Sequence, residues 1–469
     1  MSRLIVISNR VSTPKPRSAN GSQGGLAVAL AAALREYRGL WFGWSGEKTD
    51  EFTGQINLHR EDGVTTATID LEEQDLDEYY NGYANRTLWP LFHYRIDLAE
   101  YDRSFGAGYE RVNERFAETV TPLIEPDDLI WVHDYHLIPL GQQLRQRGLD
   151  NRIGFFLHIP WPPQRLLVSL PFHERLVRSM LAYDLIGFHT EEWLESFHHY
   201  ITRELGGTVA ADGTVTVGDR TVKTAAFPIG IDFSEFDEAL ASEETKQAYG
   251  TLKRSAEDKK IIIGVDRLDY SKGLEERFQG YRRFLEEHPD WRKKVSFLQI
   301  APPSREEVHT YEAIRERLDE LSGRINGEFA EVDWVPIRYV NQGYPRETLA
   351  GFYRASSVAL ITPLRDGMNL VAKEYVASQD PADPGVLILS RFAGAAHQMA
   401  EALLVNPYSK DEVSDAIRQA LEMPKAERIR RWEQLVDTVR KEDVLWWRRA
   451  FVEALQGVKT EKAVEPVPA

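Results

Sequence analysis

The sequence predicts an α/β protein with two Rossmann-like domains, each built on a parallel sheet, that face a central cleft. Three observations lead to this prediction. The 469 residues exceed what a single hydrophobic core usually supports, so two domains are expected. Short apolar runs rich in β-branched residues recur along the chain, as in strands buried on both faces. Helical stretches separate these runs, which is typical of parallel sheets covered by helices.

The composition indicates an ordinary globular protein and excludes several kinds of partner and chemistry. Hydrophobic residues make up 42% and charged residues 28% of the chain, as in ordinary globular proteins. The formal net charge of −16 argues against a nucleic-acid or anionic-membrane partner. The absence of cysteine excludes disulfides and thiolate chemistry. No apolar run has the length of a signal peptide or a membrane span, so we expect a cytoplasmic protein.

The amino-terminal domain is expected to cover residues 1–230. Pro228 and Gly230 punctuate the chain where a new alternation of strands and helices begins. An Asp-Gly pair at 212–213 indicates a hairpin turn. The expected strands are 4–7, 40–44, 65–69, 128–133, 152–157 and 184–188, and the expected helices are 26–34 and 191–205.

The carboxyl-terminal domain is expected to cover residues 231–458, with its last helix packing back on the amino-terminal domain. The charged, proline-containing residues 459–469 are expected to be disordered. The expected strands are 261–265, 295–300, 332–335, 358–361 and 386–389, and the expected helices are 275–287, 306–321 and a final one that includes 446–451.

The segment after the strand at 261–265 carries two cations, Arg267 and Lys272. It leaves the sheet at its carboxyl end, where ligands bind in open α/β sheets. A planar bidentate donor and a flexible point charge, a few residues apart before a helix, suit a diphosphate. The alternative is that both side chains are solvated loop residues.

A second segment, 361–374, starts where another strand ends and enters a helix near Asn369. Backbone N–H groups from Met368 to Leu370 and the positive end of the helix dipole favour an anionic ligand. Glu374 is placed to accept hydrogen bonds from a ribose diol, and Asp366 to meet sugar hydroxyls. The alternative is a loop acid and a helix-surface acid, both solvated.

Aromatic residues and polar strand ends mark the amino-terminal half. Tyr80, Trp89 and their aromatic neighbours suit the stacked faces of a sugar, although an aromatic cluster at the edge of the core is equally compatible. Asp134 and His158 follow neighbouring strands and should share one rim of the sheet. The His133/His136 pair lacks a third ligand at metal-binding spacing.

Four further residues fit anion binding. Arg10 follows the first strand, and Arg305 lies beyond the strand that ends near Ala301, from where it would reach a phosphorylated polyol across the cleft. Gly24 and Gly25 precede a helix, where paired glycines let ligand oxygens approach backbone N–H groups, or form a plain tight turn.

Taken together, motifs through nearly the whole chain resemble the trehalose-6-phosphate synthase family. These motifs are Ser8-Asn9-Arg10, Gly24-Gly25-Leu26, 40–44 (LWFGW), 78–81 (EYYN), Leu88-Trp89-Pro90, 133–137 (HDYHL), His158-Ile159-Pro160, 267–273 (RLDYSKG) and 366–374 (DGMNLVAKE). The resemblance implies the GT-B fold. It also implies glucose transfer from a nucleotide sugar, usually UDP-glucose, to glucose 6-phosphate with retention, giving α,α-trehalose 6-phosphate. One departure, Trp161-Pro162-Pro163 after His158-Ile159-Pro160, puts the neighbouring loop contacts in doubt.

The resemblance also implies roles for individual residues. Positions matching Arg10 and Arg305 hold the acceptor phosphate, and the matches of Trp41, Tyr80, Trp89 and Asp134 shape the acceptor pocket. Donor contacts fall on Gly24, Gly25, His158, Arg267, Lys272, Asp366, Met368, Asn369, Leu370 and Glu374. The catalytic set is Asp134, His158, Arg267, Lys272 and Asp366, with no cofactor and no metal ion required. Because no obvious carboxylate nucleophile is present, a front-face mechanism is favoured over double displacement.

Other functions remain open at this point. A glucosylglycerol-phosphate synthase or a pseudo-glycosyltransferase that joins cyclitols would use the same frame. A catalytically silent sugar-phosphate sensor is a rival of another class, although all the proposed catalytic positions are filled. The nucleotide base is not specified, and a homodimer or homotetramer is compatible with the sequence without being indicated by it.

Overall fold

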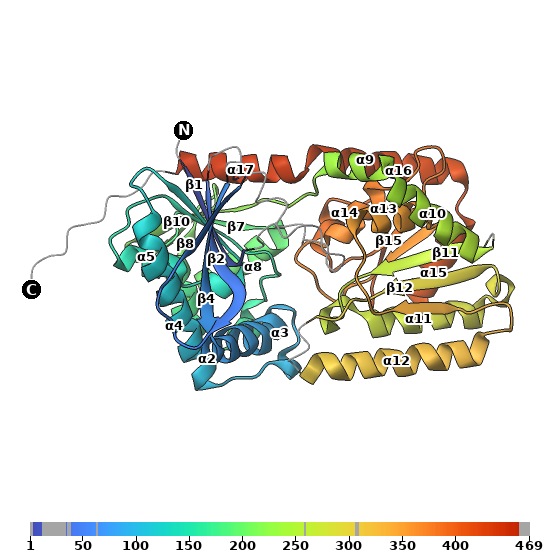
Figure 1. The fold of residues 1–469 in the computed structure, drawn as a ribbon, viewed down its shortest axis with the longest axis horizontal. Coiled ribbons are helices and arrows are strands. Elements are labelled where there is room, and N and C mark those ends of the chain that lie inside the picture. Colours follow the sequence, from blue (N-terminus) through green and yellow to red (C-terminus); the bar gives the residue numbers. More distant parts are fainter. Residues whose placement is uncertain are drawn as a thin grey trace, which may run out of the picture. The chain divides into compact units, whose positions relative to one another are not determined.

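The computed structural model describes residues 3–11, 34, 39–61, 64–257, 259–304 and 309–458. Its internal contacts divide the chain into two units. Among the described residues, unit 1 contains everything up to Pro228 together with 447–458, and unit 2 contains 229–446. Each unit is an α/β structure on its own sheet (Figure 1). The expected helix 26–34 apart from Leu34, the expected tail 459–469, Gly24, Gly25 and Arg305 lie outside the described residues.

Unit 1 is built on a ten-stranded sheet in the order β3-β4-β2-β1-β5-β6-β7-β10-β9-β8. From β4 to β10 neighbouring strands are parallel, and the sheet ends in antiparallel strands on both sides. The strands are β1 (Leu4–Arg10), β2 (Leu40–Thr49), β3 (Asn57–Glu61), β4 (Val64–Glu72), β5 (Leu129–His133), β6 (Ile153–Phe156), β7 (Leu185–Phe188), β8 (Thr208–Val209), β9 (Thr214–Val217) and β10 (Arg220–Ala226).

The helices of unit 1 follow the strands in the expected alternation, with one departure. Residues Leu76–Leu88 form a π-helical segment, η1, between two short α-helices. Such wide turns are rare and often lie at functional sites. The α-helices are α2 (Glu73–Asp75), α3 (Trp89–Phe92), α4 (Arg103–Val120), α5 (Leu140–Gln146), α6 (Gln164–Leu167), α7 (His173–Met180) and α8 (Glu191–Glu204), and the 3₁₀ turns are η2 (Ile96–Leu98), η3 (Thr121–Leu123) and η4 (Tyr135–Leu137).

The last helix, α17 (Val444–Gly457), completes the core of unit 1. Phe451 stacks on Trp131 of β5 with 4.5 Å between ring centroids, and Trp447 lies 4.9 Å from the same ring. A Cβ at Gly154 or Gly187 would lie within 2.9 Å of the Phe451 ring. Glycines in β6 and β7 therefore make the room that this helix needs.

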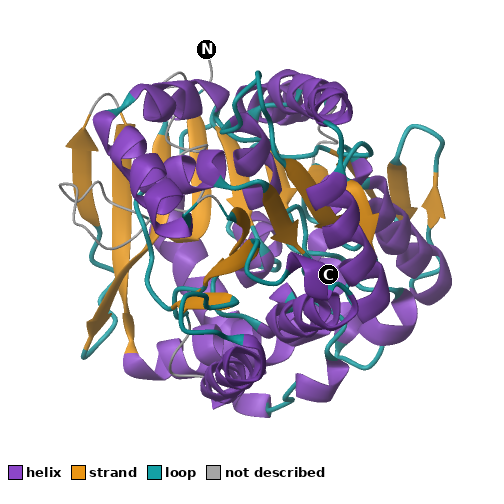
Figure 2. Ribbon diagram, turned by 90° about the vertical axis from the view of Figure 1, so that its right-hand side faces the viewer, coloured by secondary structure: helices purple, strands orange, loops and turns teal. Residues whose placement is uncertain are grey.

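Unit 2 is built on a six-stranded, entirely parallel sheet in the order β13-β12-β11-β14-β15-β16. Figure 2 shows the strands in orange and the helices that enclose them in purple. The strands are β11 (Lys260–Val265), β12 (Val295–Ile300), β13 (Ile337–Val340), β14 (Val358–Ile361), β15 (Val386–Ser390) and β16 (Leu403–Val405). The helices are α9 (Phe233–Ala241), α10 (Glu243–Ala256), α11 (Leu274–Glu287), α12 (His309–Phe329), α13 (Arg346–Ala355), α14 (Leu370–Ala377), α15 (Lys410–Glu422) and α16 (Lys425–Lys441), with 3₁₀ turns η5 (Tyr270–Lys272), η6 (Pro289–Trp291) and η7 (Gly394–His397).

The structure confirms the predicted α/β class and most of the predicted strands, but the strand expected at 332–335 is wrong. The third strand of this region is β13, at Ile337–Val340. Val332 and Val335 resemble strand residues but are exposed, whereas Trp334 is buried and its indole N–H donates to the Val295 carbonyl at 2.7 Å. A single anchoring tryptophan, not a paired strand, occupies the predicted position.

Candidate active site

A buried arginine organises the strand ends of unit 2. The guanidinium of Arg277, on α11, is fully buried. It donates to Asp266 Oδ2 at 2.7 Å, to Gln299 Oε1 at 3.0 Å and to Thr362 Oγ1 at 3.0 Å. These partners come from the ends of β11, β12 and β14. Burial raises the pKa of Asp266, and the charge of Arg277 opposes that rise. A fourth hydrogen bond, to the Lys272 carbonyl at 3.2 Å, ties the predicted diphosphate loop to this hub.

The loop that carries Arg267 and Lys272 has a fixed backbone. Asp269 caps η5 by accepting the Ser271 N–H at 2.9 Å, and its other oxygen lies 3.5 Å from Arg267 Nη2. Gly273 has φ +63°, and a Cβ there would lie 2.4 Å from the Thr362 carbonyl oxygen. Only glycine fits this close approach. Lys272 is therefore held next to the end of β14.

Three of the predicted donor residues meet in one polar cluster. Lys272 Nζ lies 2.5 Å from Asp366 Oδ2, and the Asn369 side-chain amide donates to the same oxygen at 3.1 Å. Asn369 has φ +76° and caps α14, because its Oδ1 accepts the Ala372 N–H at 3.1 Å. Asn369 therefore links the start of α14 to the Lys272–Asp366 pair.

The segment around Gly394, which the sequence did not indicate as part of the site, supports the loop from Asp366 to Met368. The Gly394 N–H donates to the Asp366 carbonyl at 3.1 Å, and the Ala395 N–H donates to the Met368 carbonyl at 2.8 Å. A Cβ at Gly394 would lie 2.0 Å from the Gly367 carbonyl oxygen. Met368 is buried, and Leu370 begins α14. The segment around Gly394 thus fixes the backbone from Asp366 to Met368.

Arg267 and Glu374 line one cavity of about 210 Å³. Burial raises the pKa of Glu374, and the Arg346 charge opposes that rise. The Tyr353 hydroxyl donates to Glu374 Oε2 at 3.4 Å. The other lining residues are mostly apolar: Phe236, Val265, Asp266, Ile300, Pro302, Gly343, Tyr344, Arg346, Leu349, Tyr353 and Val371. A cavity with mostly apolar walls, two arginines and two carboxylates suits a nucleoside attached to a phosphate.

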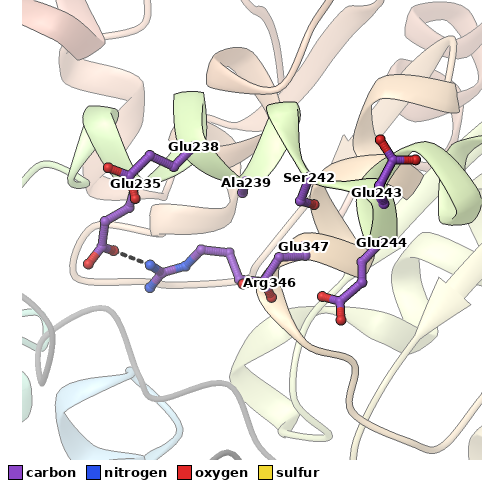
Figure 3. A pocket seen from close by; sticks show the side chains of 8 residues that line it. All are labelled: Glu235, Glu238, Ala239, Ser242, Glu243, Glu244, Arg346 and Glu347. Carbon is purple, nitrogen blue, oxygen red and sulfur yellow. Dashed lines mark hydrogen bonds and ion pairs between the residues drawn. The ribbon is translucent and has the colours of Figure 1, made fainter.

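Arg346 also lines a larger hollow of about 610 Å³, and Figure 3 shows its ion pair with Glu235 of α9. The remaining lining residues of this hollow are Glu238, Ala239, Ser242, Glu243, Glu244 and Glu347. Such a concentration of carboxylates repels a diphosphate. The smaller cavity is therefore the better candidate for a nucleotide, despite its size. Sequence reasoning missed Arg346, since nothing local distinguishes it from a surface arginine.

In unit 1 the structure brings Asp134 and His158 together, as the neighbouring strands predicted. Asp134 follows β5 with φ +75°, an uncommon value for a residue other than glycine. Its Oδ1 accepts the backbone N–H of His158 at 3.2 Å, and its own backbone N–H donates to the Phe156 carbonyl at 2.8 Å. The strained backbone is thus held by hydrogen bonds to the end of β6.

The imidazoles of His158 and His133 form a pair beside Asp134. His133 Nδ1 lies 3.0 Å from His158 Nε2. Burial lowers the pKa of both imidazoles, and a neighbouring histidine adds to each shift: His158 lowers the pKa of His133, and His189 lowers that of His158. Both imidazoles are therefore neutral near pH 7.

Arg10 and Tyr80 are linked through Trp44. The Arg10 guanidinium lies 5.5 Å from the centre of the Trp44 ring, which lies 5.8 Å from Tyr80. Tyr80 also stacks on His136, with 5.9 Å between centroids and 11° between planes. Trp41, named from the resemblance, is instead buried, and its indole N–H donates to Ser8 Oγ at 2.8 Å. Trp44 was not singled out from the sequence, although it belongs to the same motif.

Trp89 lies at the start of α3 and is largely buried. Its ring is 5.6 Å from Tyr135, the residue after Asp134, and 4.0 Å from His93. The Tyr135 hydroxyl donates to Asn85 Oδ1 at 2.9 Å. Trp89 thus packs beside the Asp134 loop, and its acceptor role stays a prediction.

In the described part of the chain, no group of three or more His, Asp or Glu side chains is arranged to hold a metal ion. No helix in that part combines the length and apolar character needed to cross a membrane.

The chain is similar to known proteins over nearly its whole length. Residues 2–457 match the family profile of glycosyltransferase family 20. A trehalose-6-phosphate synthase of Sinorhizobium fredii is 49% identical over 457 residues, which cover 97% of this chain and 98% of that protein.

Solved structures resemble the chain over nearly its full length. A UDP-forming α,α-trehalose-phosphate synthase from Burkholderia xenovorans, in complex with glucose-6-phosphate, has a TM-score of 0.93 and 49% identity, covering 97% of this chain and 100% of that one. A trehalose-6-phosphate structure from E. coli, bound with UDP-2-fluoro glucose, has a TM-score of 0.94 and 44% identity, covering 98% and 100%. The chain therefore belongs to glycosyltransferase family 20.

Proposed function

We propose that this protein transfers glucose from UDP-glucose to glucose 6-phosphate with retention of configuration, producing α,α-trehalose 6-phosphate and UDP. This is the first step of trehalose biosynthesis. One observation carries the proposal: Arg267 and Glu374 line the same cavity, and the loop with Lys272 lies beside it. Similarity to a synthase bound to UDP-2-fluoro glucose and to one bound to glucose-6-phosphate supports both substrates.

The donor is assigned to unit 2. Glu374 accepts hydrogen bonds from the ribose diol, and the apolar walls of the 210 Å³ cavity contact the nucleoside. Arg267 and Lys272 bind the diphosphate together with the first turn of α14. Lys272 exchanges its contact with Asp366 for a phosphate oxygen, which frees the Asp366 carboxylate to accept a hydrogen bond from the transferred glucose.

The acceptor is assigned to unit 1. Arg10 binds the phosphate of glucose 6-phosphate, and its guanidinium is kept in place by the face of Trp44. Tyr80, stacked on His136, and Trp89 form the walls of the sugar pocket. Asp134 completes the acceptor pocket, whereas His158, also in unit 1, contacts the glucose that is transferred from the donor. Gly24, Gly25 and Arg305 keep the donor and acceptor roles that the resemblance implies for them.

The proposed mechanism is departure and attack on the same face of the sugar. A double displacement needs a free carboxylate behind the anomeric carbon. The Asp134 carboxylate accepts the backbone N–H of His158. The Asp366 carboxylate accepts the Asn369 amide and, in this proposal, a hydroxyl of the transferred glucose, so neither is placed as an unconstrained nucleophile. The leaving diphosphate instead accepts the proton of the incoming hydroxyl. Arg267, Lys272 and the α14 dipole neutralise the charge that grows on the diphosphate, so the proposal needs no metal ion or cofactor.

Both proposed substrates are charged phosphate esters that do not cross membranes unaided. The proposal therefore keeps the cytoplasm as the location of the protein.

Release of UDP tests the proposal directly. Purified protein is incubated with UDP-glucose and either glucose 6-phosphate or glycerol 3-phosphate, and the disaccharide is identified by NMR. We expect turnover with glucose 6-phosphate and an α,α-linked product. Turnover with glycerol 3-phosphate alone would identify a different transferase, and binding without turnover would identify a sensor. A parallel series with GDP- and ADP-glucose measures the base preference.

A further inference from the structure

Three histidines follow one another at the carboxyl ends of adjacent strands in unit 1. His133 ends β5, His158 comes two residues after β6, and His189 follows β7 directly. The rings of His133 and His158 are 23° from coplanar, with centroids 5.3 Å apart and nitrogens 3.0 Å apart. The two rings therefore meet edge to edge, in a hydrogen bond between His133 Nδ1 and His158 Nε2. Since both are neutral, one ring donates and the other accepts.

The surroundings of His133 decide which ring donates. His133 is fully buried against aromatic rings, with Trp131 at 4.6 Å and Trp447 at 6.3 Å between centroids. Among the described residues, three buried nitrogens of this cluster have no hydrogen-bond partner: His133 Nε2 and the two indole nitrogens of Trp131 and Trp447. The indole nitrogens can only donate.

The two tautomers differ in what they bury. If His158 were the donor, His133 would carry its own proton on Nε2, adding a third unpaired N–H to a cluster that offers no acceptor. If His133 donates from Nδ1, its Nε2 carries no proton. The cluster then contains an unpaired lone pair together with the two indole donors. An unpaired buried N–H is the costlier arrangement, and orphaned N–H groups are rarer than under-used acceptors. The second arrangement is therefore favoured.

We propose that His133 is a positioning residue that donates its Nδ1–H to His158 Nε2 and so fixes the His158 proton on Nδ1. His158 then offers the transferred sugar a hydrogen-bond donor rather than a lone pair. The inference rests on the proposed contact between His158 and that sugar. It also assigns the proton chemistry, because a donor at this position does not act as the base for the incoming hydroxyl. That role passes to the leaving phosphate.

The tautomer is measurable without substrate. Full-length enzyme labelled with ¹⁵N-histidine gives long-range ¹H–¹⁵N correlations, and the His158→Gln variant identifies the His158 signals. We expect a protonated, pyrrole-like shift for His158 Nδ1 and an unprotonated, pyridine-like shift for Nε2. The reverse pattern would overturn the inference. This measurement uses the wild-type protein, so it does not depend on how any His133 variant folds.

Two variants of similar size separate positioning from packing. His133→Asn keeps an N–H donor near the Nδ1 position, whereas His133→Leu keeps the volume and removes the donor. We expect His133→Leu to lower kcat by about tenfold or more, the worth of one well-placed hydrogen bond, and to show both His158 tautomers, while His133→Asn retains most of kcat and a single tautomer. If His133 only filled space, the apolar Leu variant would be the more active and the more stable of the two, which would overturn the inference.

The role of His133 and the proposed function can be contradicted independently. Wild-type enzyme that forms UDP from UDP-glucose and glucose 6-phosphate, but shows the reverse tautomer, would contradict the role of His133 alone. Wild-type enzyme with the expected tautomer but no such turnover would contradict the proposed function.

Discussion

Removal of the Arg267 side chain should lower kcat strongly while leaving the fold intact. The side chain is 41% exposed, and the Asp269 carboxylate, 3.5 Å away, also accepts the Ser271 N–H and the Tyr311 hydroxyl, so loss of Arg267 should cost little stability. In the proposed mechanism Arg267 stabilises charge that appears on the diphosphate only as the glycosidic bond breaks. Loss of one such preorganised donor costs about 3 kcal/mol of transition-state stabilisation, or roughly a hundredfold in kcat.

A matched control is available in the same unit. Arg317 of α12 is 43% exposed and pairs with Glu275 at 3.2 Å, but it does not line the 210 Å³ cavity. UDP release with saturating glucose 6-phosphate should fall about a hundredfold or more in Arg267→Ala and stay at the wild-type rate in Arg317→Ala. An Arg267→Ala enzyme with an unchanged kcat and only a raised KM for UDP-glucose would refute the reasoning, because it would show that Arg267 binds ground state and transition state equally.

Three further predictions test other parts of the account. Arg10→Ala should raise the KM for glucose 6-phosphate with a smaller change in kcat, and an unchanged acceptor saturation curve would remove Arg10 from the acceptor site. Because burial raises the pKa of Glu374 and Arg346 opposes that rise, the KM for UDP-glucose should increase as pH falls through this raised pKa. Arg346→Gln should move the onset to higher pH, and Glu374→Gln should abolish it; identical profiles in all three enzymes would contradict the ribose assignment. Burial lowers the pKa of Lys373 to about 7, below its ordinary value of 10.5, so the unfolded state binds the extra proton between these values. The thermal stability of the wild type relative to Lys373→Met should therefore rise from pH 7 towards pH 10, and a constant difference would contradict the lowered pKa of Lys373 in the folded state.

The strands were predictable because their signal is local. Runs such as 261–265 and 153–156 are apolar on both faces, as a central parallel strand requires, and both form strands in the structure. The error at 332–335 has a physical cause. β-Branched residues there gave a strand pattern, but exposure depends on what packs over the segment, and only Trp334 is covered.

Site residues could be predicted from the sequence mainly where they lie in loops that directly follow a strand. Loops at strand ends indicated Lys272, Asp366 and Asn369, and the structure joins these three in one cluster. The supporting residues could not be found in the same way. Nothing in the local sequence distinguishes Arg277 from an ordinary helix arginine, and its burial depends on partners from three different strands. The same holds for the segment around Gly394, whose role is visible only through its backbone contacts with the Asp366 loop.

A crystal structure of the protein with UDP and glucose 6-phosphate would show where both substrates bind. We expect Arg267 and Lys272 to donate to oxygens of the UDP diphosphate, this diphosphate to face the first turn of α14 at Asn369, and Glu374 to accept from the ribose. A diphosphate bound away from Arg267, Lys272 and Asn369 would contradict the donor assignment.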